Sequence, residues 1–263
     1  MARNSLKNVV RLLETVTTSL PVEEDFLQDL KRSIELSESK VHRKPSQTYK
    51  PSSMNCIRNM WYQRVGHDED ETAPSYILTG ITNSGTDIHV RVQTAVAQMK
   101  ENGIDCEYVN VADFVKQREL TDLEIVSQNG METKLFNTRW SMSFLCDGII
   151  RYKGRYYILE LKTESANKFY NRRGVDPKHY NQATAYSLAF NLNDVIFVYI
   201  SRDILDMKAF MLTVTDDMKM DVIGRIEECE TYVHENKVPP MPDDASPKLC
   251  QYCSYRGACK IDG

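Results

Sequence analysis

The stretch MSFLCDGIIRYKGRYYILELKT, residues 142–163, decides the fold class of this chain. Two segments rich in Ile, Leu, Phe and Tyr, 142–151 and 155–163, flank a Tyr-Lys-Gly turn. Apolar segments of this length joined by a short Gly-containing turn are typical of a β-hairpin. We therefore predict a hairpin that carries Asp147 on one strand and Glu160 on the other.

The elements after this hairpin alternate between helix and strand. Asp176 and the following proline form a good N-cap and first turn for a helix that runs to about Phe190. Residues 195–201, VIFVYIS, are typical of a fully buried strand. A last helix is predicted over 216–236, where a Pro-Pro pair breaks it soon afterwards. Together these elements predict an α/β core with a central mixed sheet flanked by helices on both sides.

The residues before the hairpin predict mainly helices. Apolar residues at helical spacing over 5–20, and again after Pro21, predict a helical hairpin. A polar connection follows, so residues 1–50 are expected to form an appendage and linker, and 51–263 the main domain. The capping-box spacing from Ser84 to Asp87 predicts the start of a further helix.

Composition excludes several classes of protein. The chain has 263 residues, 41% hydrophobic and 27% charged, and lacks an apolar run of the length needed to cross a bilayer. It is therefore expected to be neither disordered nor membrane-spanning. The N-terminus has no signal-peptide pattern, which favours a cytoplasmic location. A net charge of −4 counts against a protein that coats nucleic acid non-specifically, but allows a local basic groove.

Glu160-Leu-Lys162 ends an apolar strand, and the strand period puts Glu160 and Lys162 on one face while Leu161 points into the core. Asp147, on the partner strand, can approach Glu160. Two neighbouring carboxylates suit a hard cation such as Mg²⁺ or Mn²⁺, and a lysine beside them can orient or deprotonate a water. This set predicts phosphodiester hydrolysis. The alternative is a solvated charge pair at the end of a strand.

Three further side chains lie at helical positions near these elements. His89 lies on the inner face of the helix predicted after Ser84, as a metal ligand or as an ordinary core histidine. Gln182 and Tyr186 are four residues apart, so both project from one helix face. They are expected to touch the active-site strand or a nucleic-acid strand, or else to be ordinary polar residues of a helix face.

A basic run with interleaved tyrosines lies between the hairpin and the next helix. It would suit a phosphate backbone with stacked bases, or form only a solvated loop. Its members are Lys168, Tyr170, Arg172, Arg173, Lys178, His179 and Tyr180.

The cysteines are distributed unevenly. Cys250, Cys253 and Cys259 form a tight group typical of a metal centre, and Cys56 is the best candidate for a fourth ligand. The other three, Cys106, Cys146 and Cys229, lie in predicted regular elements and are expected to be small buried residues. Thiolate chemistry alone leaves zinc and an iron-sulfur cluster both open.

The ordered motifs resemble those of the RecB-like branch of the PD-(D/E)XK nucleases. The resemblance covers about Ser52 to Lys260. It is carried by Gly85-x-x-x-His89, Asp147, Glu160-x-Lys162 and Gln182-x-x-x-Tyr186. The four cysteines, Cys56, Cys250, Cys253 and Cys259, resemble the iron-sulfur subgroup that includes AddB-type nucleases and CRISPR-associated RecB-like exonucleases.

The resemblance implies a restriction-endonuclease-like core and a role for each motif. Mn²⁺ or Mg²⁺ would be bound by His89, Asp147, Glu160 and the Leu161 carbonyl. Lys162 would be the catalytic lysine, and Gln182 and Tyr186 would support the active site and the DNA. The four cysteines would hold a [4Fe-4S] cluster that staples the C-terminal segment to the region around Cys56.

The expected activity is therefore metal-dependent hydrolysis of DNA by an exonuclease that acts on single-stranded or end-containing DNA. A structure-specific endonuclease is the alternative within the same chemistry. The rival from another class is a non-catalytic nucleic-acid-binding module with a structural four-cysteine site. DNA is the expected partner, and protein partners from recombination, replication or CRISPR adaptation are compatible with it.

Overall fold

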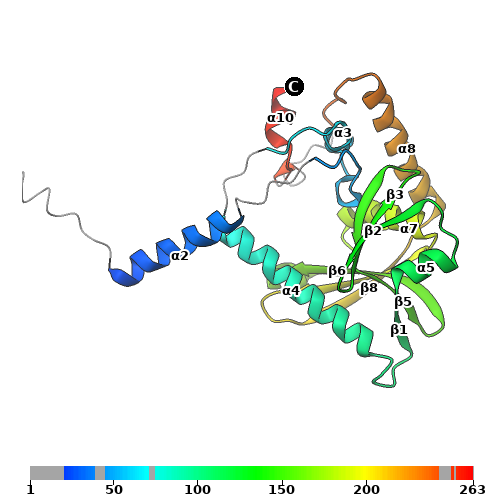
Figure 1. The fold of residues 1–263 in the computed structure, drawn as a ribbon, viewed down its shortest axis with the longest axis horizontal. Coiled ribbons are helices and arrows are strands. Elements are labelled where there is room, and N and C mark those ends of the chain that lie inside the picture. The colour runs from blue at the N-terminus through cyan, green and yellow to red at the C-terminus, as the bar shows by residue number, and fades with distance from the viewer. Residues whose placement is uncertain (1–20, 39–44, 71–74, 243–249, 252, 263) are drawn as a thin grey trace, which may run out of the picture. The chain divides into compact units, whose positions relative to one another are not determined.

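The computed structural model describes residues 21–38, 45–70, 75–242, 250–251 and 253–262 (Figure 1). The described residues fall into two units. The smaller unit contains helix α2 (Val22–Glu38) and the start of helix α4 (Tyr76–Gln98), as far as Thr82. The larger unit contains the remaining described residues.

Helix α2 confirms the helix predicted after Pro21. Its first turn carries Glu23, Glu24 and Asp25, whose negative charges interact favourably with the free N–H groups of a helix N-terminus. The other predicted helix of the N-terminal hairpin, residues 5–20, lies outside the described residues.

The larger unit contains most of the regular elements. Its helices, apart from α4, are η1 (Pro51–Ser53), α3 (Ile57–Val65), α5 (Val111–Gln117), α6 (Ala166–Asn171), η2 (Pro177–His179), α7 (Tyr180–Phe190), α8 (Asp216–His234) and α10 (Arg256–Ile261). Its strands are β1 (Cys106–Val109), β2 (Leu123–Asn129), β3 (Glu132–Asn137), β4 (Met142–Cys146), β5 (Gly148–Tyr152), β6 (Arg155–Glu164), β7 (Asp194–Ser201) and β8 (Met207–Thr213).

The central sheet of this unit has five strands in the order β1-β5-β6-β7-β8. β6 and β7 are parallel, and the other neighbouring pairs are antiparallel. Helix α7 lies in the connection between the two parallel strands, as parallel pairing requires a crossover. A second, antiparallel sheet has the order β2-β3-β4. The predicted fold class, a mixed α/β protein with a central mixed sheet, is confirmed.

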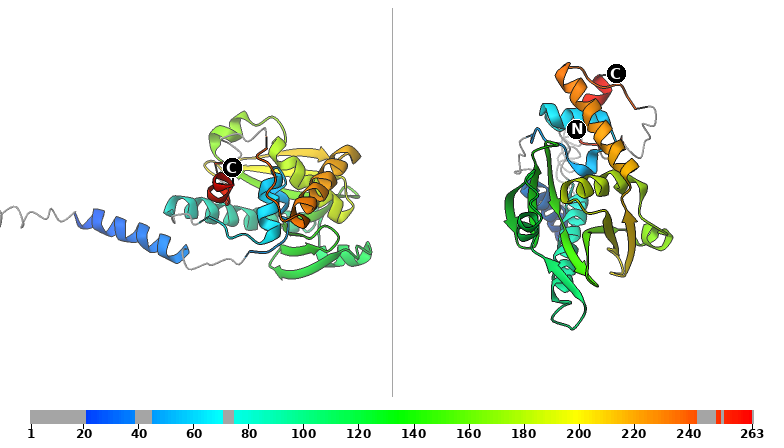
Figure 2. Two further views of the ribbon diagram at one scale, coloured as in Figure 1. Left: turned by 90° about the horizontal axis from the view of Figure 1, so that it is seen from above. Right: turned by 90° about the vertical axis from the view of Figure 1, so that its right-hand side faces the viewer.

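Helices cover both faces of the central sheet because residues along β6 alternate between the faces. Leu159 and Leu161 pack against Ile88 of α4 on one face. Ile158 lies in the larger core on the other face, together with residues of α7 such as Ala183 and Phe190. Figure 2 shows these elements from two further directions. The residue period of two therefore leaves Glu160 and Lys162 on the α7 face.

The single strand predicted over 142–151 is wrong, since two strands occupy this range. β4 ends at Cys146 and pairs with β3, whereas β5 begins at Gly148 and pairs with β1 and β6. Asp147 lies at the junction between the two sheets, on neither strand. The apolar pattern is continuous across the junction because both strands have buried faces, so it does not reveal the change of partner.

The helix start predicted at Ser84 is also wrong, because α4 begins at Tyr76 and passes through Gly85. A side-chain carbon added at Gly85 would lie 3.3 Å from Thr163 Oγ1 on β6. The glycine therefore marks a close approach of helix and strand inside the helix, rather than a helix end.

The elements predicted after the hairpin are confirmed. Asp176 caps the chain at the predicted position, although its first turn is the 3₁₀ helix η2 that leads directly into α7. The buried strand is β7, and the last long helix is α8, which ends at His234. Among the helices that the structure describes, none is long and apolar enough to cross a membrane.

Candidate active site

The junction at Asp147 places a carboxylate beside β6. β5 pairs with β6 only as far as Leu159, so the strand continues beyond its partner. The Leu161 N–H then donates a hydrogen bond to Asp147 Oδ2 at 2.8 Å. The Asp147 side chain thus takes the place of a strand partner, which fixes it next to Glu160.

Residues that were not predicted from the sequence hold the backbone of Asp147. Gln93 of α4, which is 1% exposed, donates through Nε2 to the Asp147 carbonyl at 2.7 Å. The Tyr108 hydroxyl lies 2.8 Å from the same carbonyl. A side-chain carbon at Gly148 would lie 2.6 Å from the Tyr108 ring, so glycine is needed there. The sequence feature that could have indicated a role for Gln93 is its spacing of four residues from His89, which places both side chains on one helix face.

His89 reaches Asp147 from α4. Its Nδ1 lies 3.2 Å from Asp147 Oδ1. Burial opposes protonation of this imidazole, but the Asp147 carboxylate outweighs burial and raises the pKa of His89 above its usual value. His89 therefore contacts an acidic group of the candidate site and is not a purely apolar-core histidine.

Glu160 and Lys162 share the α7 face of β6, as predicted. Lys162 Nζ lies 2.6 Å from Glu160 Oε1 and donates to Gln182 Oε1 at 3.0 Å. Glu160 is 3% exposed, and this burial raises its pKa to about 7 although Lys162 acts in the opposite direction. Buried carboxylates with a raised pKa are common at functional sites. The burial of Glu160 also argues against a solvated charge pair.

Gln182 and Tyr186 join this group from α7. Gln182 Nε2 donates to Glu160 Oε1 at 2.8 Å and to the Tyr186 hydroxyl at 2.9 Å. The Tyr186 hydroxyl in turn donates to the Leu145 carbonyl at 3.2 Å. Tyr186 is 4% exposed, so it contacts Gln182 from the buried side of the site.

The donor types at this site fit a hard divalent cation. Two carboxylates, an imidazole and the Leu161 backbone lie together, and oxygen ligands with one nitrogen suit Mg²⁺ or Mn²⁺. The charges of Asp147 and Glu160 are close enough to raise the pKa of Glu160. In this structure Lys162 and His89 contact these two acids. Within the described ranges, no three His, Cys, Asp or Glu side chains already have the arrangement of a metal-binding group.

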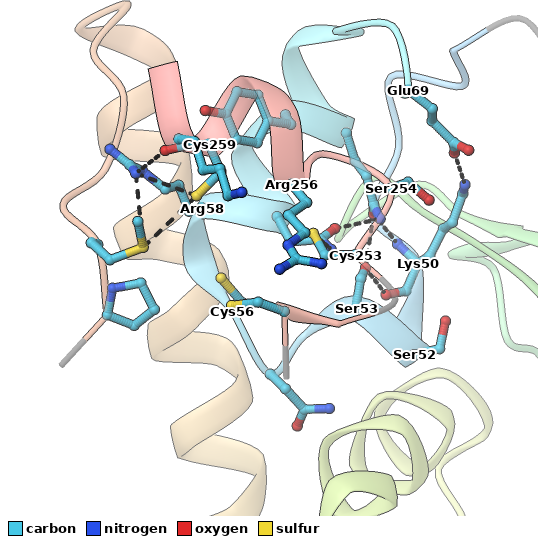
Figure 3. A pocket seen from close by; sticks show the side chains of 18 residues that line it. Lys50, Ser52, Ser53, Cys56, Arg58, Glu69, Cys253, Ser254, Arg256 and Cys259 are labelled. Carbon is cyan, nitrogen blue, oxygen red and sulfur yellow. Dashed lines mark hydrogen bonds and ion pairs between the residues drawn. The ribbon is translucent and has the colours of Figure 1, made fainter. Parts of the chain in front are cut away.

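The four cysteines predicted to act together line one cavity of about 700 Å³ (Figure 3). Cys56 precedes α3, and Cys250, Cys253 and Cys259 come from the C-terminal segment. Asn59 Nδ2 donates to Cys253 Sγ at 3.3 Å, and Arg58 Nη1 lies 3.3 Å from Cys259 Sγ. Two of the four sulfur atoms, those of Cys253 and Cys259, therefore have N–H donors directed at them, as the sulfurs of thiolate ligands often do.

The other three cysteines are buried, as predicted. Cys106, Cys146 and Cys229 lie in β1, β4 and α8, and each is at most 2% exposed. None of the seven cysteines, all of which lie in the described part of the chain, forms a disulfide.

The basic run is only partly available to a ligand. Arg172 binds Glu164 through two hydrogen bonds of 2.8 and 2.7 Å and lies over the Tyr199 ring. This arginine therefore organises the loop. Lys178 is more exposed and has a long, 3.8 Å ion pair with Asp176.

Comparisons with known proteins give weak similarities. No family model and no curated protein matches this sequence. The crystal structure of SSO0001 is 17% identical with a TM-score of 0.45, and the alignment covers 92% of this chain and 98% of that chain. The alkaline exonuclease LHK-Exo from Laribacter hongkongensis is 12% identical with a TM-score of 0.43, covering 73% of this chain and 92% of that chain. Its complex with dAMP has the same identity and TM-score, covering 82% and 95%. At TM-scores below 0.5, these similarities assign no activity to this chain.

Proposed function

We propose that this protein is a metal-dependent deoxyribonuclease of the PD-(D/E)XK type. One observation carries the proposal: Asp147, from the junction of two sheets, meets Glu160 and Lys162 of β6 in a single, mostly buried group. Asp147 is thirteen positions from Glu160 and fifteen from Lys162 in the sequence. Each of the three residues has the type that phosphodiester hydrolysis requires.

The residues have distinct tasks in the proposed reaction. Asp147, Glu160, His89 and the Leu161 carbonyl would hold Mg²⁺ or Mn²⁺. When bound, that cation would offset the charge of the scissile phosphate and lower the pKa of a water. Lys162, positioned by Gln182, would orient the attacking water and offset negative charge that develops on the phosphoryl oxygens. A bond forms between the water oxygen and phosphorus, the phosphorus–oxygen bond to the leaving strand breaks, and the leaving oxygen gains a proton.

The substrate class comes from the motif resemblance rather than from the geometry. We propose an exonuclease that acts on single-stranded or end-containing DNA, with a structure-specific endonuclease as the second possibility. Both use the same residues, so the pattern of products distinguishes them.

The four-cysteine cavity supports a second cofactor. We propose that Cys56, Cys250, Cys253 and Cys259 hold a [4Fe-4S] cluster, with a structural zinc ion as the alternative. Either centre would join the C-terminal segment to α3, because the four sulfurs come from both ends of the larger unit.

The test of the nuclease proposal uses end-labelled single-stranded and double-stranded DNA with Mg²⁺, Mn²⁺ or EDTA. The wild-type protein should cleave only with a divalent cation. The variants Asp147→Asn, Glu160→Gln and Lys162→Met should each lose at least about a hundredfold in rate, since each removes a charge from the reacting site. Mononucleotides released from an end would identify an exonuclease, and internal products an endonuclease.

Glu124→Gln is the matched control, because Glu124 is an exposed acid on β2 outside this group. It should cleave like the wild type. A folded, metal-loaded wild-type protein that binds DNA without cleaving it would overturn the enzyme and leave the non-catalytic binding module.

A further inference from the structure

His179 lies next to the candidate active site, on the same face of the central sheet. Across the parallel pair, Glu160 is opposite Phe197 and Lys162 is opposite Tyr199. The His179 ring stacks over both of these aromatic neighbours, with centroids 5.9 Å from Phe197 and 6.0 Å from Tyr199. The imidazole therefore lies one strand away from the Glu160 and Lys162 pair.

Helix geometry also places His179 beside Gln182. His179 ends η2 and precedes α7 directly, three residues before Gln182, and residues at this spacing are neighbours on a helix surface. Gln182 itself contacts Lys162 and Glu160. Lys162 and His179 therefore both lie beside Gln182.

The hydrogen bonds around Tyr199 fix which nitrogen of His179 carries the proton. The Asp176 N–H donates to the Tyr199 hydroxyl oxygen at 3.0 Å, and His179 Nδ1 lies 2.9 Å from the same oxygen. Among the described residues, the Tyr199 hydroxyl has no other acceptor, so its proton is satisfied only by donation to Nδ1. A neutral His179 then carries its own proton on Nε2.

The N–H group at Nε2 of His179 is the donor that these hydrogen bonds leave without a partner among the described residues. The side-chain atoms buried without a partner within the described part of the chain are Trp61 Nε1 and Ser201 Oγ. His179 Nε2 is not among these atoms, and no described residue is its hydrogen-bond partner, so it keeps some contact with solvent and can donate to a ligand. The His179 ring is held on its other side by Phe197 and Tyr199, which are 0% and 1% exposed, so the donor has a fixed direction.

The charges around His179 favour an anionic ligand. Lys162 of β6, Lys178 of η2 and Arg172 all place positive charge near the ring, and Asp176 is the nearby acid. Burial and then these cations lower the pKa of His179 to about 3, so the ring is neutral at physiological pH. A neutral N–H donor can bind a phosphate oxygen in this basic environment without adding a further repelling charge.

We propose that Nε2–H of His179 donates a hydrogen bond to a phosphate oxygen of the DNA strand adjacent to the scissile bond, and that Tyr199 acts as the positioning residue that selects this tautomer. The inference rests on the proposed nuclease function. It assigns a substrate contact to one residue of the basic run, and a structural role to Arg172 in the same run.

The test compares His179→Phe, which keeps an aromatic ring over Phe197 and Tyr199, with His179→Gln, which restores a neutral N–H donor. Affinity is measured for a fluorescent single-stranded oligonucleotide in EDTA, and kcat/KM for cleavage in Mg²⁺. A hydrogen bond to a charged group contributes enough that His179→Phe should weaken both by about tenfold or more. His179→Gln should recover most of this loss, and Tyr199→Phe should fall between them. His234→Phe, on the exposed end of α8, should match the wild type.

Two further readouts distinguish a donor from a merely structural ring. The ¹⁵N spectrum of the free protein should show the proton of His179 on Nε2, and Tyr199→Phe should redistribute it toward Nδ1. The ratio of wild-type to His179→Phe affinity should stay constant between about pH 5 and 8, because the neutral form is the one that binds.

Different outcomes would overturn the role of His179 and the proposed nuclease activity. An active wild type with a fully active His179→Phe variant, a proton on Nδ1, or a ratio that grows as pH falls would each overturn the role of His179 alone. A wild type that neither binds nor cleaves DNA would overturn the nuclease proposal together with it.

Discussion

At the residue scale, the buried carboxylate of Glu160 links the candidate site to the stability of the protein. Its pKa is raised from 4.5 to about 7, mainly because burial disfavours the charged form. Between these values the folded state holds a proton that the unfolded chain releases. In the absence of metal, the contribution of Glu160 to the free energy of unfolding should therefore be full below about pH 4.5 and be lost as pH rises through 7.

This dependence can be measured by urea unfolding in EDTA at several pH values from 4.5 to 8. Glu160→Gln should flatten the decline in stability across this window, because the amide does not titrate. Glu124→Gln, at an exposed position, should keep the wild-type slope. Equal slopes for wild type and Glu160→Gln would show that Glu160 titrates alike in the folded and unfolded states.

Tyr186 supports the same group through its hydroxyl. Tyr186→Phe keeps the buried ring but removes one of the two partners of Gln182 Nε2 and the donor to the Leu145 carbonyl. Leaving buried polar groups without partners costs roughly 1–3 kcal/mol, so we expect a loss of that size in the free energy of unfolding, together with slower cleavage. Tyr170→Phe, at a residue that is 57% exposed, is the control and should change neither quantity. Unchanged stability of Tyr186→Phe would mean that water replaces the hydroxyl.

At the scale of secondary-structure elements, a pair of asparagines joins the start of α7 to the segment before α3. Asn181 Nδ2 donates to Asn55 Oδ1 at 3.0 Å and to the Met54 carbonyl at 3.1 Å. Asn55 Nδ2 donates to the Lys178 carbonyl at 2.9 Å. These bonds connect the residue next to Cys56 with the helix that carries Gln182, so the cysteine cavity and the candidate active site share a structural support.

A double-mutant cycle tests this connection. Asn55→Ala and Asn181→Ala should each lower the free energy of unfolding by about 1 kcal/mol, and the double variant by less than the sum. The single variants should also slow cleavage, since both loosen the N-terminal end of α7. Additive effects on stability would indicate that the two side chains act independently, and would argue against a shared support.

At the scale of the whole molecule, the proposed four-cysteine centre would link the region around Cys56 to the C-terminal segment that carries Cys250, Cys253 and Cys259. If the proposed centre is present, its loss should release the C-terminal segment from α3. A covalent link across so long a loop stabilises a protein by roughly 4 kcal/mol, and a metal centre acts in the same sense. Cys56→Ser and Cys259→Ser should therefore lose bound metal, lower the melting temperature and increase proteolysis of the C-terminal segment.

Metal and sulfide analysis identifies the centre in anaerobically purified protein. Iron with acid-labile sulfide and a brown colour would support the cluster, whereas zinc alone would support the structural alternative. Cys106→Ala, in β1 and outside the cavity, should keep the metal content of the wild type. A wild-type protein free of both metals, with an unchanged melting temperature in Cys56→Ser, would contradict a metal-holding role.

Local patterns in the sequence determined the elements and the residue types of the candidate site. The period of two along β6 was enough to place Glu160 and Lys162 on one face with Leu161 opposite, since alternation depends only on backbone geometry. Helical spacing likewise placed Gln182 and Tyr186 on one side of α7, and cysteine spacing brought out the thiols that line one cavity.

Only the tertiary structure decided how these parts meet. The apolar pattern over 142–151 is the same whether one strand or two run through it, and the choice of pairing partners that separates β4 from β5 depends on residues far away in the chain. That separation places Asp147 at the junction, where Gln93 and Tyr108 hold its carbonyl. Long-range pairing and burial are properties of the folded molecule, so no local period reveals them.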